Sequence, residues 1–276
     1  GESQSAFRMT TYVNAIHPLY NPYDGYLIHS RGAYATPLAQ EPQTAIATPA
    51  EVFIRTDLNV PVLVFQSETD VVLPSLNSVL VRQEDTDSLR FWEVAGTAHA
   101  DRYTLGAGDG DIGTDPSVAS VGELDNVQGF ITCDSPVNSG PMHYVFNTAL
   151  AAMNSWIING EAPPTGDALE TTDDLTGFIL DDLGNVRGGI RTPYVDAPVA
   201  ILSGLGQTGT SFCGLFGTTV MFTPAELFSL YGSQLGYVDA VTAATEEAFE
   251  LGFLLREDAD QIIEWAPQQW QIQTTE

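Results

Sequence analysis

The first five residues, Gly1-Glu2-Ser3-Gln4-Ser5, have the pattern of a serine nucleophile. A catalytic serine stands on a sharp turn between a strand and a helix, and small residues two positions before and after it avoid a clash in that turn. Gly1 and Ser5 are both small, although glycine is more usual than serine at the second position. Because so short a pattern also arises by chance, a base and an acid elsewhere in the chain must support it.

Asp70 and His99 are the candidate acid and base. A nucleophilic serine needs a histidine that takes its proton and a carboxylate that orients the histidine. Asp70 follows the apolar run 60–65, and His99 follows a strand expected at 89–94, so both are expected at strand ends, where parallel sheets place functional residues. The order serine, acid, histidine is that of the α/β-hydrolase fold. We therefore predict that His99 lies between Ser3 and Asp70.

Each of these residues also has a structural interpretation, and two others compete for their roles. Singly, the serine suits a helix cap, the aspartate a turn and the histidine a loop; the order and the strand context together favour catalysis. Glu68 is the alternative acid, since it lies two residues before Asp70 on the same face of a segment expected to be extended. His143, at the start of a strong helix pattern, is the alternative base.

Three further polar residues are assigned from their positions. Glu2 and His29 are predicted to border the substrate, while His17, which precedes Pro18, is predicted to be structural. No His, Cys or Asp cluster has zinc spacing, and the Gly- and Asp-rich loop 104–125 lacks the closing Glu of an EF-hand. The Gly-rich loop 204–217 does not fit a phosphate loop, since the chain has no lysine. The sequence therefore predicts neither a metal nor a cofactor.

The elements that must position these residues alternate between helix and strand. Strands are expected at 26–29, 60–65, 89–94 and 197–202, with helices from residue 4, at 75–82, at 141–159 and from 224 to 266, and a frayed tail after residue 266. This alternation predicts an α/β fold with a mostly parallel sheet and flanking helices. We divide the chain into a catalytic core, 1–165, and a C-terminal extension, 166–276, packed on that core.

The composition limits the partners. The chain has 36 acidic residues against nine basic ones, all arginine, and a formal net charge of −27. Such a surface repels phosphate, which argues against nucleic acid and anionic membranes and leaves small neutral or cationic substrates. The acidity suits a secreted enzyme or a high-salt habitat.

No apolar run approaches the roughly 20 residues of a membrane span. We predict that Cys133 and Cys213 form a disulfide in an exported protein.

The chain resembles a bacterial "alpha/beta hydrolase domain" family of secreted or cell-envelope proteins. The resemblance rests on the segments 1–6 (GESQSA), 24–32 (DGYLIHSRG) and 184–191 (GNVRGGIR), the last continuing to Pro193. It implies an α/β-hydrolase fold whose N-terminal strands precede the nucleophile turn and are missing from this sequence, so that this chain is the C-terminal portion. The missing half is expected as a separate chain or as a preceding segment. The resemblance of Thr69-Asp70 and of 71–74 to the family's acid loop favours Asp70 over Glu68.

The expected activity is hydrolysis of carboxylic esters through an acyl-enzyme on Ser3, with a small-molecule ester as substrate. The backbone N–H of Gln4, the residue after the nucleophile, is expected to supply one oxyanion donor, and the second is expected upstream. Amides, lactones and polyesters are alternative substrates, because this fold supports many chemistries. A non-catalytic binding or scaffold protein that retains the fold is the alternative of a different class.

Overall fold

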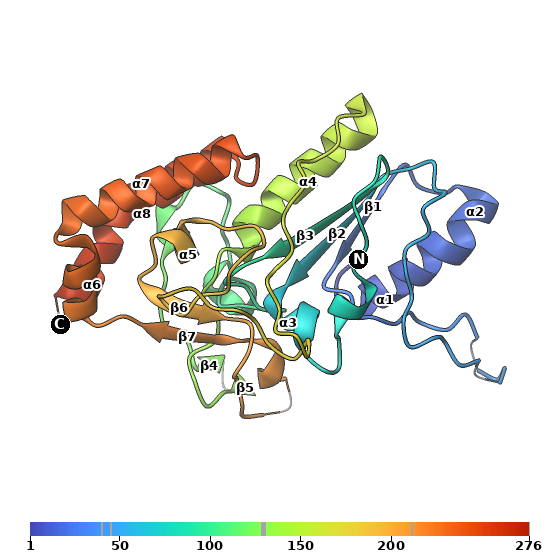
Figure 1. Ribbon diagram of the computed structural model, residues 1–276, viewed down its shortest axis with the longest axis horizontal. Helices are drawn as coiled ribbons and strands as arrows, with labels where there is room; N and C mark the ends of the chain where they lie inside the picture. Colours follow the sequence, from blue (N-terminus) through green and yellow to red (C-terminus); the bar gives the residue numbers. More distant parts are fainter. Residues whose placement is uncertain (40, 45, 128–130, 211, 276) are drawn as a thin grey trace.

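A computed structural model describes the whole chain except residues 40, 45, 128–130, 211 and 276. Its centre is a parallel sheet of three strands in the order β1 (Tyr26–His29), β2 (Val62–Ser67) and β3 (Leu89–Val94), as Figure 1 shows. Helices flank this sheet, which confirms the predicted α/β class. Two of the predicted strands, 26–29 and 89–94, have the bounds that the sequence predicts.

Successive side chains of β2 point to opposite faces of the sheet, and all of them are buried. Both faces of the sheet are therefore covered at β2. Val62 and Val64 pack toward α1 (Gln4–Thr11), which continues through a π-helical turn (Tyr12–Ile16) into α2 (His17–Tyr20). Leu63 and Phe65 pack toward α4 (Met142–Asn159). The unbroken apolar run of β2 thus reflects burial between two helical layers.

The outer edge of β1 is paired with the chain's first residues. Glu2 forms a parallel bridge with His29, the N–H of His29 donates to the Gly1 carbonyl, and the N–H of Ser3 donates to the His29 carbonyl at 3.1 Å. The sheet therefore holds the backbone on both sides of Glu2 in place.

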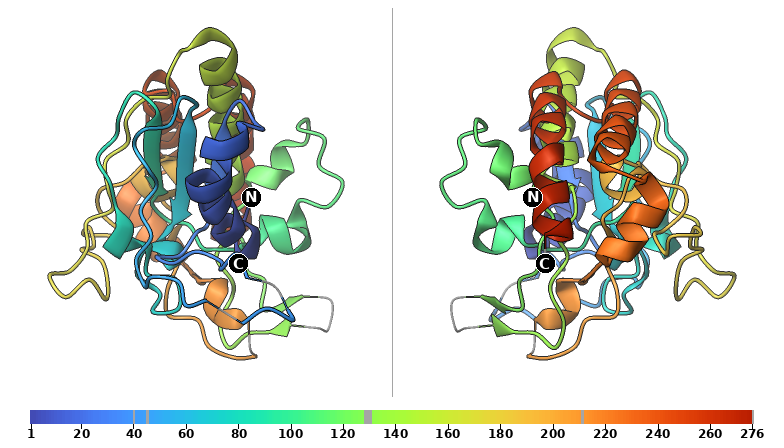
Figure 2. Two further views of the ribbon diagram at one scale, coloured as in Figure 1. Left: turned by 90° about the vertical axis from the view of Figure 1, so that its right-hand side faces the viewer. Right: turned by 90° about the vertical axis from the view of Figure 1, so that its left-hand side faces the viewer.

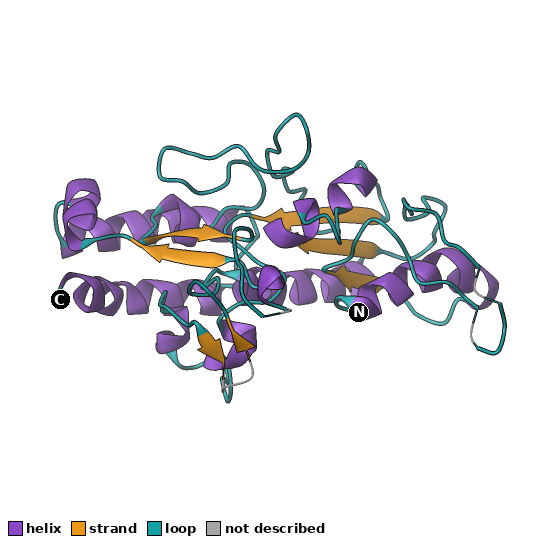
Figure 3. Cartoon of the chain, turned by 90° about the horizontal axis from the view of Figure 1, so that it is seen from below, coloured by secondary structure: helices purple, strands orange, loops and turns teal. Residues whose placement is uncertain are grey.

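The chain beyond α4 forms a ribbon and a helical layer. The ribbon is antiparallel, with β6 (Ala200–Ser203) and β7 (Thr218–Met221), and Figure 3 shows it apart from the central sheet; a short pair, β4 (Asn126–Val127) and β5 (Ile131–Thr132), lies elsewhere. After α5 (Pro193–Asp196) and α6 (Pro224–Tyr231), helices α7 (Gln234–Glu250) and α8 (Arg256–Thr274) pack side by side at the end opposite α1 and α2 (Figure 1). Ile190 bridges Val94 of β3, so this region contacts the sheet.

The segment 103–119 stands out from the body in both views of Figure 2. It contains a π-helical turn (Tyr103–Ala107) and a 3₁₀ turn (Pro116–Ala119). Two further 3₁₀ turns lie at Ser78–Val81 and Cys213–Leu215.

Several predicted bounds were wrong. Strand β2 begins at Val62 rather than at residue 60, since Pro61 has no N–H to donate and only its carbonyl joins the ladder. The predicted helix 75–82 is only the 3₁₀ turn at 78–81, and helix α3 (Glu68–Val72) precedes it. The strand predicted at 197–202 begins at Ala200, after α5.

The C-terminal tail and the buried face of α4 also differ from expectation. Helix α8 continues past Pro267 to Thr274, because the Gln269 amide exchanges two hydrogen bonds with the Val121 backbone. The prediction of a frayed tail after residue 266 was therefore wrong. On α4, helical spacing puts Leu150 and Ile157 on one stripe with the buried Met153, yet these two are 50% and 39% exposed.

Cys133 and Cys213 form a disulfide, as predicted, 80 residues apart in sequence. The pair packs against Val137 and Phe216 in a small apolar cluster of its own. None of the helices in the described part of the chain combines the length and the apolar character that a bilayer crossing requires.

Candidate active site

Ser3 stands on a strained turn between the sheet and α1. Its φ of 52° and ψ of −121° lie where non-glycine residues are rare and cost about 1–3 kcal/mol. The turn is so tight that a Cβ on Gly1 would lie 2.9 Å from the Ser5 carbonyl oxygen and 3.4 Å from the Ser5 Cβ. This proximity explains why both flanking positions must be small. No side-chain cap bond occupies the Ser3 hydroxyl.

His99 lies between the hydroxyl of Ser3 and the carboxylate of Asp70. Its Nε2 is 2.9 Å from Ser3 Oγ, and its Nδ1 is 2.6 Å from Asp70 Oδ1. The backbone N–H of His99 donates to Thr69 Oγ1 at 3.2 Å, which fixes the loop after β3 against α3. The structure thus brings together the three side chains that the sequence singled out.

Asp70 is held by the cap of its own helix. The N–H and the hydroxyl of Ser67 each donate to Asp70 Oδ2 at 2.8 Å, which forms the capping box that begins α3. Because Oδ2 accepts these two bonds, Oδ1 is directed at His99. The acid is therefore oriented before any substrate binds.

The charges of the acid and the base support each other. Burial opposes ionisation of Asp70, but the hydrogen bond and charge of His99 outweigh it and hold the pKa of the carboxyl below its ordinary value. Burial also opposes protonation of His99, but the hydrogen bond and charge of Asp70 raise its pKa above the ordinary value. The Nδ1–H of His99 donates to the carboxylate, so a neutral His99 presents an unprotonated Nε2 to Ser3.

Glu68, the alternative acid, does not contact His99. The segment that holds Glu68 and Asp70, expected to be extended, is helical from Glu68 onward, so the two acids do not share a face. The Glu68 carboxylate instead accepts the N–H groups of Gly96 at 2.6 Å and Gly204 at 2.7 Å. The prediction that placed the two acids on one extended face was wrong.

The alternative base, His143, does not contact Ser3 either. Its ring stacks on Tyr103 with centroids 3.8 Å apart, and neither ring nitrogen has a partner among the described residues. Burial lowers the pKa of His143 to about 3. His17 has the structural position expected of it, with Nδ1 2.8 Å from the Tyr26 hydroxyl and Nε2 3.2 Å from Asn59 Oδ1.

A groove of about 460 Å³ lies beside Gly1 and Glu2, the two residues that precede Ser3. Glu2 and His29 line it, and its other walls come from α1, β1, α4 and the loop residues beside them: Gly1, Met9, Tyr23, Gly25, Tyr26, Leu27, Phe146 and Leu150. The ring of His29 stacks on Phe146 with centroids 4.6 Å apart, and its Nε2 is buried with no partner among the described residues. Burial lowers the pKa of His29 and favours its neutral form.

Gln4 is the first residue of α1, and the first N–H groups of a helix have no partner within it. Gln4 is exposed, and its N–H donates to none of the described backbone groups outside its own helix. The N–H of Ser3 is already bonded to His29 and cannot serve as a second donor.

The sequence model of the family described as "Alpha/beta hydrolase domain" matches residues 1–264. The chain belongs to this family. No match was found among curated proteins or among solved structures. The predicted α/β-hydrolase fold is confirmed by the family match.

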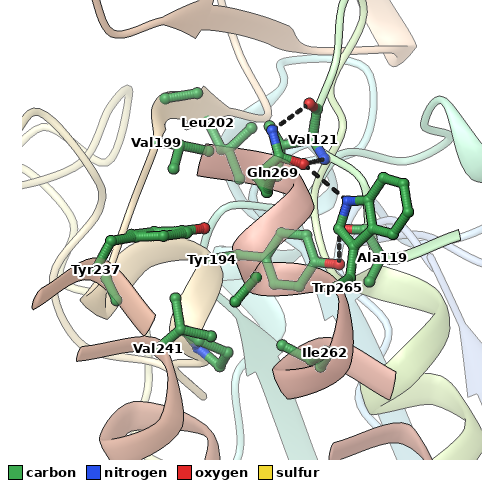
Figure 4. A pocket seen from close by; sticks show the side chains of 14 residues that line it. Ala119, Val121, Tyr194, Val199, Leu202, Tyr237, Val241, Ile262, Trp265 and Gln269 are labelled. Atoms are coloured by element: carbon green, nitrogen blue, oxygen red, sulfur yellow. Dashed lines mark hydrogen bonds between the residues drawn. The ribbon is translucent and has the colours of Figure 1, made fainter. Parts of the chain in front are cut away.

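Another cavity of this α/β-hydrolase domain lies away from Ser3, between α5, α7 and α8 (Figure 4). Its volume is about 30 Å³, which suits one or two water molecules rather than a substrate. The Tyr194 hydroxyl donates to the Ala119 carbonyl there, and Trp265 donates to Gln269. Within the described residues, no group of three or more His, Cys, Asp or Glu side chains is arranged to hold a metal ion.

Two positioning residues of this hydrolase domain were missed from the sequence. Ser67 caps α3 and orients Asp70, and Thr69 accepts the His99 N–H while donating to the Gly204 carbonyl at 2.6 Å. The pattern of serine followed three residues later by an acid, Ser67 to Asp70, is a capping-box signal that identifies the start of α3.

Proposed function

We propose that this α/β-hydrolase domain is a serine hydrolase that cleaves carboxylic esters through an acyl-enzyme intermediate. The observation that carries the proposal is the continuous series from Ser3 Oγ to His99 Nε2, 2.9 Å, and from His99 Nδ1 to Asp70 Oδ1, 2.6 Å. Hydrogen-bond contact on both sides of an imidazole is what proton transfer from a serine requires.

The proposed reaction has two halves. His99 Nε2 takes the proton of Ser3 Oγ as that oxygen attacks the ester carbonyl, and the N–H of Gln4 donates to the developing oxyanion. When the tetrahedral intermediate collapses, the C–O bond to the alcohol breaks and His99 returns the proton to the leaving oxygen. Water, deprotonated by His99, then attacks the acyl-Ser3 ester; the bond to Ser3 Oγ breaks, His99 returns the proton to that oxygen, and the carboxylic acid is released. Asp70 stabilises the imidazolium in both halves.

The groove beside Ser3 supports a small ester as substrate. Glu2 and His29 line this groove and are the residues proposed to contact a group bound next to Ser3, and the remaining walls are largely apolar. The carboxylate of Glu2 and the overall charge of −27 favour neutral or cationic esters over anionic ones.

We also infer that the protein works in an oxidising compartment, exported from the cell or held in its envelope. The disulfide between Cys133 and Cys213 supports this location, because such bonds are rare in reducing cytosol.

Labelling with a fluorophosphonate probe tests the proposal against a non-catalytic scaffold role. We expect covalent labelling of the wild type at Ser3 and none of Ser3→Ala, with Ser5→Ala, two residues away, labelled like the wild type. A panel of aryl esters of increasing acyl length, with matched aryl amides, then defines the substrate. Absence of both labelling and ester hydrolysis in a folded wild-type protein would favour the scaffold role.

A further inference from the structure

Glu68 is a completely buried carboxyl group that takes no direct part in the proposed chemistry. It lies at the first position of α3, two residues before Asp70. None of the ion pairs in the described part of the chain involves it, and the arginine that acts on it at longer range, Arg191, is paired with Asp181 and Asp196. A buried acid without a cation is costly unless hydrogen bonds satisfy it.

The carboxylate of Glu68 joins two loops that are far apart in sequence. Oε1 accepts the N–H of Gly96 at 2.6 Å, in the loop that carries His99, and Oε2 accepts the N–H of Gly204 at 2.7 Å, just after β6. Both distances are short for N–H···O hydrogen bonds. Each oxygen thus anchors a different segment to α3.

Thr69 reinforces the same two connections. Its hydroxyl donates to the Gly204 carbonyl at 2.6 Å and accepts the N–H of His99 at 3.2 Å. Residues 68, 69 and 70 therefore each contact the His99 loop, the first two through its backbone and the third through the imidazole.

The packing leaves these loops little freedom to move by themselves. A Cβ on Gly204 would lie 2.6 Å from the Glu68 Cβ, from the Thr69 nitrogen and from the Thr97 carbonyl oxygen, so only glycine allows this approach. The segment after β6 is thereby pressed against α3 and the His99 loop at once. The carboxylate of Glu68 is the polar group that satisfies the N–H groups brought together there.

We propose that Glu68 is a positioning residue, which holds the 96–99 loop so that His99 Nε2 stays within reach of Ser3. This inference rests on the proposed serine hydrolase function. A displacement of about 1 Å at a catalytic group costs as much as 10²-fold in rate, so a loosened loop reduces kcat. Substrate binding in the groove beside β1 does not involve Glu68, so KM should change little.

The ionisation of Glu68 bears on the choice of variant. Burial raises the pKa of Glu68 to about 8, while the two backbone N–H groups oppose that rise, so kcat and KM of the variants are compared at about pH 9, where the wild-type side chain is ionised and accepts both bonds. Glu68→Gln keeps the length of the side chain but offers one acceptor oxygen and one donor group. One of the two backbone N–H groups then faces a donor, and one loop loses its anchor.

The experiment compares Glu68→Gln with Glu93→Gln in the full chain. Glu93 is the matched control, since its carboxylate is also buried and also accepts a backbone N–H, that of Leu169. Unlike Glu68, it pairs with an arginine, Arg82, and it has no hydrogen bond with the His99 loop among the described residues. We expect Glu68→Gln to lose about 10- to 100-fold in kcat on an aryl ester and in fluorophosphonate labelling rate, with KM within about twofold. Glu93→Gln should retain its kcat even where it lowers the melting temperature more.

The pH profile supplies a readout that a purely structural role does not move. Asp70 raises the pKa of His99, so a displaced loop weakens that contact and shifts the acid limb of kcat/KM to lower pH in Glu68→Gln but not in Glu93→Gln. Equal kcat values and equal limbs in the two variants would overturn the inference while an active wild type leaves the hydrolase function intact. An inactive wild type would instead reject the proposed function.

If Glu68→Gln melts below the assay temperature, Glu68→Asp, which is too short to reach both loops, is assayed at lower temperature. Failure of both to fold would make Glu68 a folding residue and overturn the inference.

Discussion

Asp70 Oδ1 lies 2.6 Å from His99 Nδ1, while the other oxygen of Asp70 accepts two bonds from Ser67. Both oxygens of the Asp70 carboxylate therefore have fixed hydrogen-bond partners. Because Oδ1 accepts the Nδ1–H of His99, Asp70 selects the tautomer of His99 whose Nε2 is unprotonated. This relationship provides the first prediction.

Asp70→Asn should reduce kcat/KM on an aryl ester by about 10³- to 10⁴-fold, because the amide can donate to Nδ1 and favour the wrong tautomer of His99. The measurement is steady-state kinetics with a melting curve for each variant. Asp57→Asn, at an exposed ion pair with Arg55, is the control and should retain wild-type rates. A loss of less than tenfold in Asp70→Asn would reject Asp70 as the acid.

The pH dependence follows from the raised pKa of His99. The base must be neutral, so kcat/KM should fall as the pH drops through a value above 6.5, and the limb should move to lower pH in Asp70→Asn. The effect of His99 on folding stability depends on pH in the other direction from its effect on activity. Its raised pKa adds stability to the folded state below pH 6.5, and this stability is lost as the pH rises through the folded-state pKa. The lowered pKa of Asp70 adds stability above 3.8 that is lost as the pH falls. Thermal unfolding across pH should show the largest deficit of Asp70→Asn between these two values.

His143→Phe should leave kcat and KM within about twofold of the wild type. The ring would keep its stacking on Tyr103, and the change removes two nitrogens that lack partners among the described residues. The unfolding free energy should stay the same or rise by about 1 kcal/mol. Kinetics and denaturant titration measure both quantities; a tenfold loss of kcat would restore His143 as a candidate base.

His29→Phe tests the proposed contact with the substrate. The phenyl ring keeps the stacking on Phe146 and the backbone bond to Ser3, but it removes the unpartnered Nε2. We expect KM to rise about three- to tenfold for an ester that uses this nitrogen, the equivalent of one hydrogen bond, with kcat nearly unchanged. Comparison with Leu150→Ala, at the rim of the same groove, separates polar contact from acyl-chain fit. Unchanged KM across the ester panel would exclude His29 from the substrate site.

Removal of the disulfide should destabilise the protein by about 3–5 kcal/mol, since the bond closes a long loop of 80 residues. Denaturant unfolding of Cys133→Ser/Cys213→Ser, and of the wild type with and without a thiol reductant, measures the loss. The variant should be insensitive to the reductant. A reduced wild type as stable as the oxidised one would show that the bond is not needed for stability.

The sequence predicted β1 and β3 to the residue because each has a clear apolar pattern bounded by polar turns. The segment that holds Glu68 and Asp70 was expected to be extended but is helical, and the β-branched Val71 and Val72 that follow them would also suit a strand. The capping bond of Ser67 and the burial between loops decide in favour of helix. Burial on α4 was only partly predictable, because periodicity identifies an apolar face but not which positions a neighbour covers.

The serine, acid and base could be selected from the sequence because order and strand context are visible in it. The contacts of Glu68 and Thr69 could not, since their partner Gly204 is more than 130 residues away and no local pattern brings it to α3. Long-range loop packing of this kind depends on the whole fold.

The disulfide has a consequence for how the chain can be divided. The bond between Cys133 and Cys213 encloses α4, the proposed boundary at residue 165 and the whole segment up to β6 in one covalent ring. The stretch 161–168 is mostly exposed and is the natural place for a protease to cut near that boundary. A single cut there would yield two fragments that migrate as one species until a reductant opens the ring. The residues on either side of position 165 therefore remain one molecule in an oxidising environment, even after the peptide chain between them has been cut.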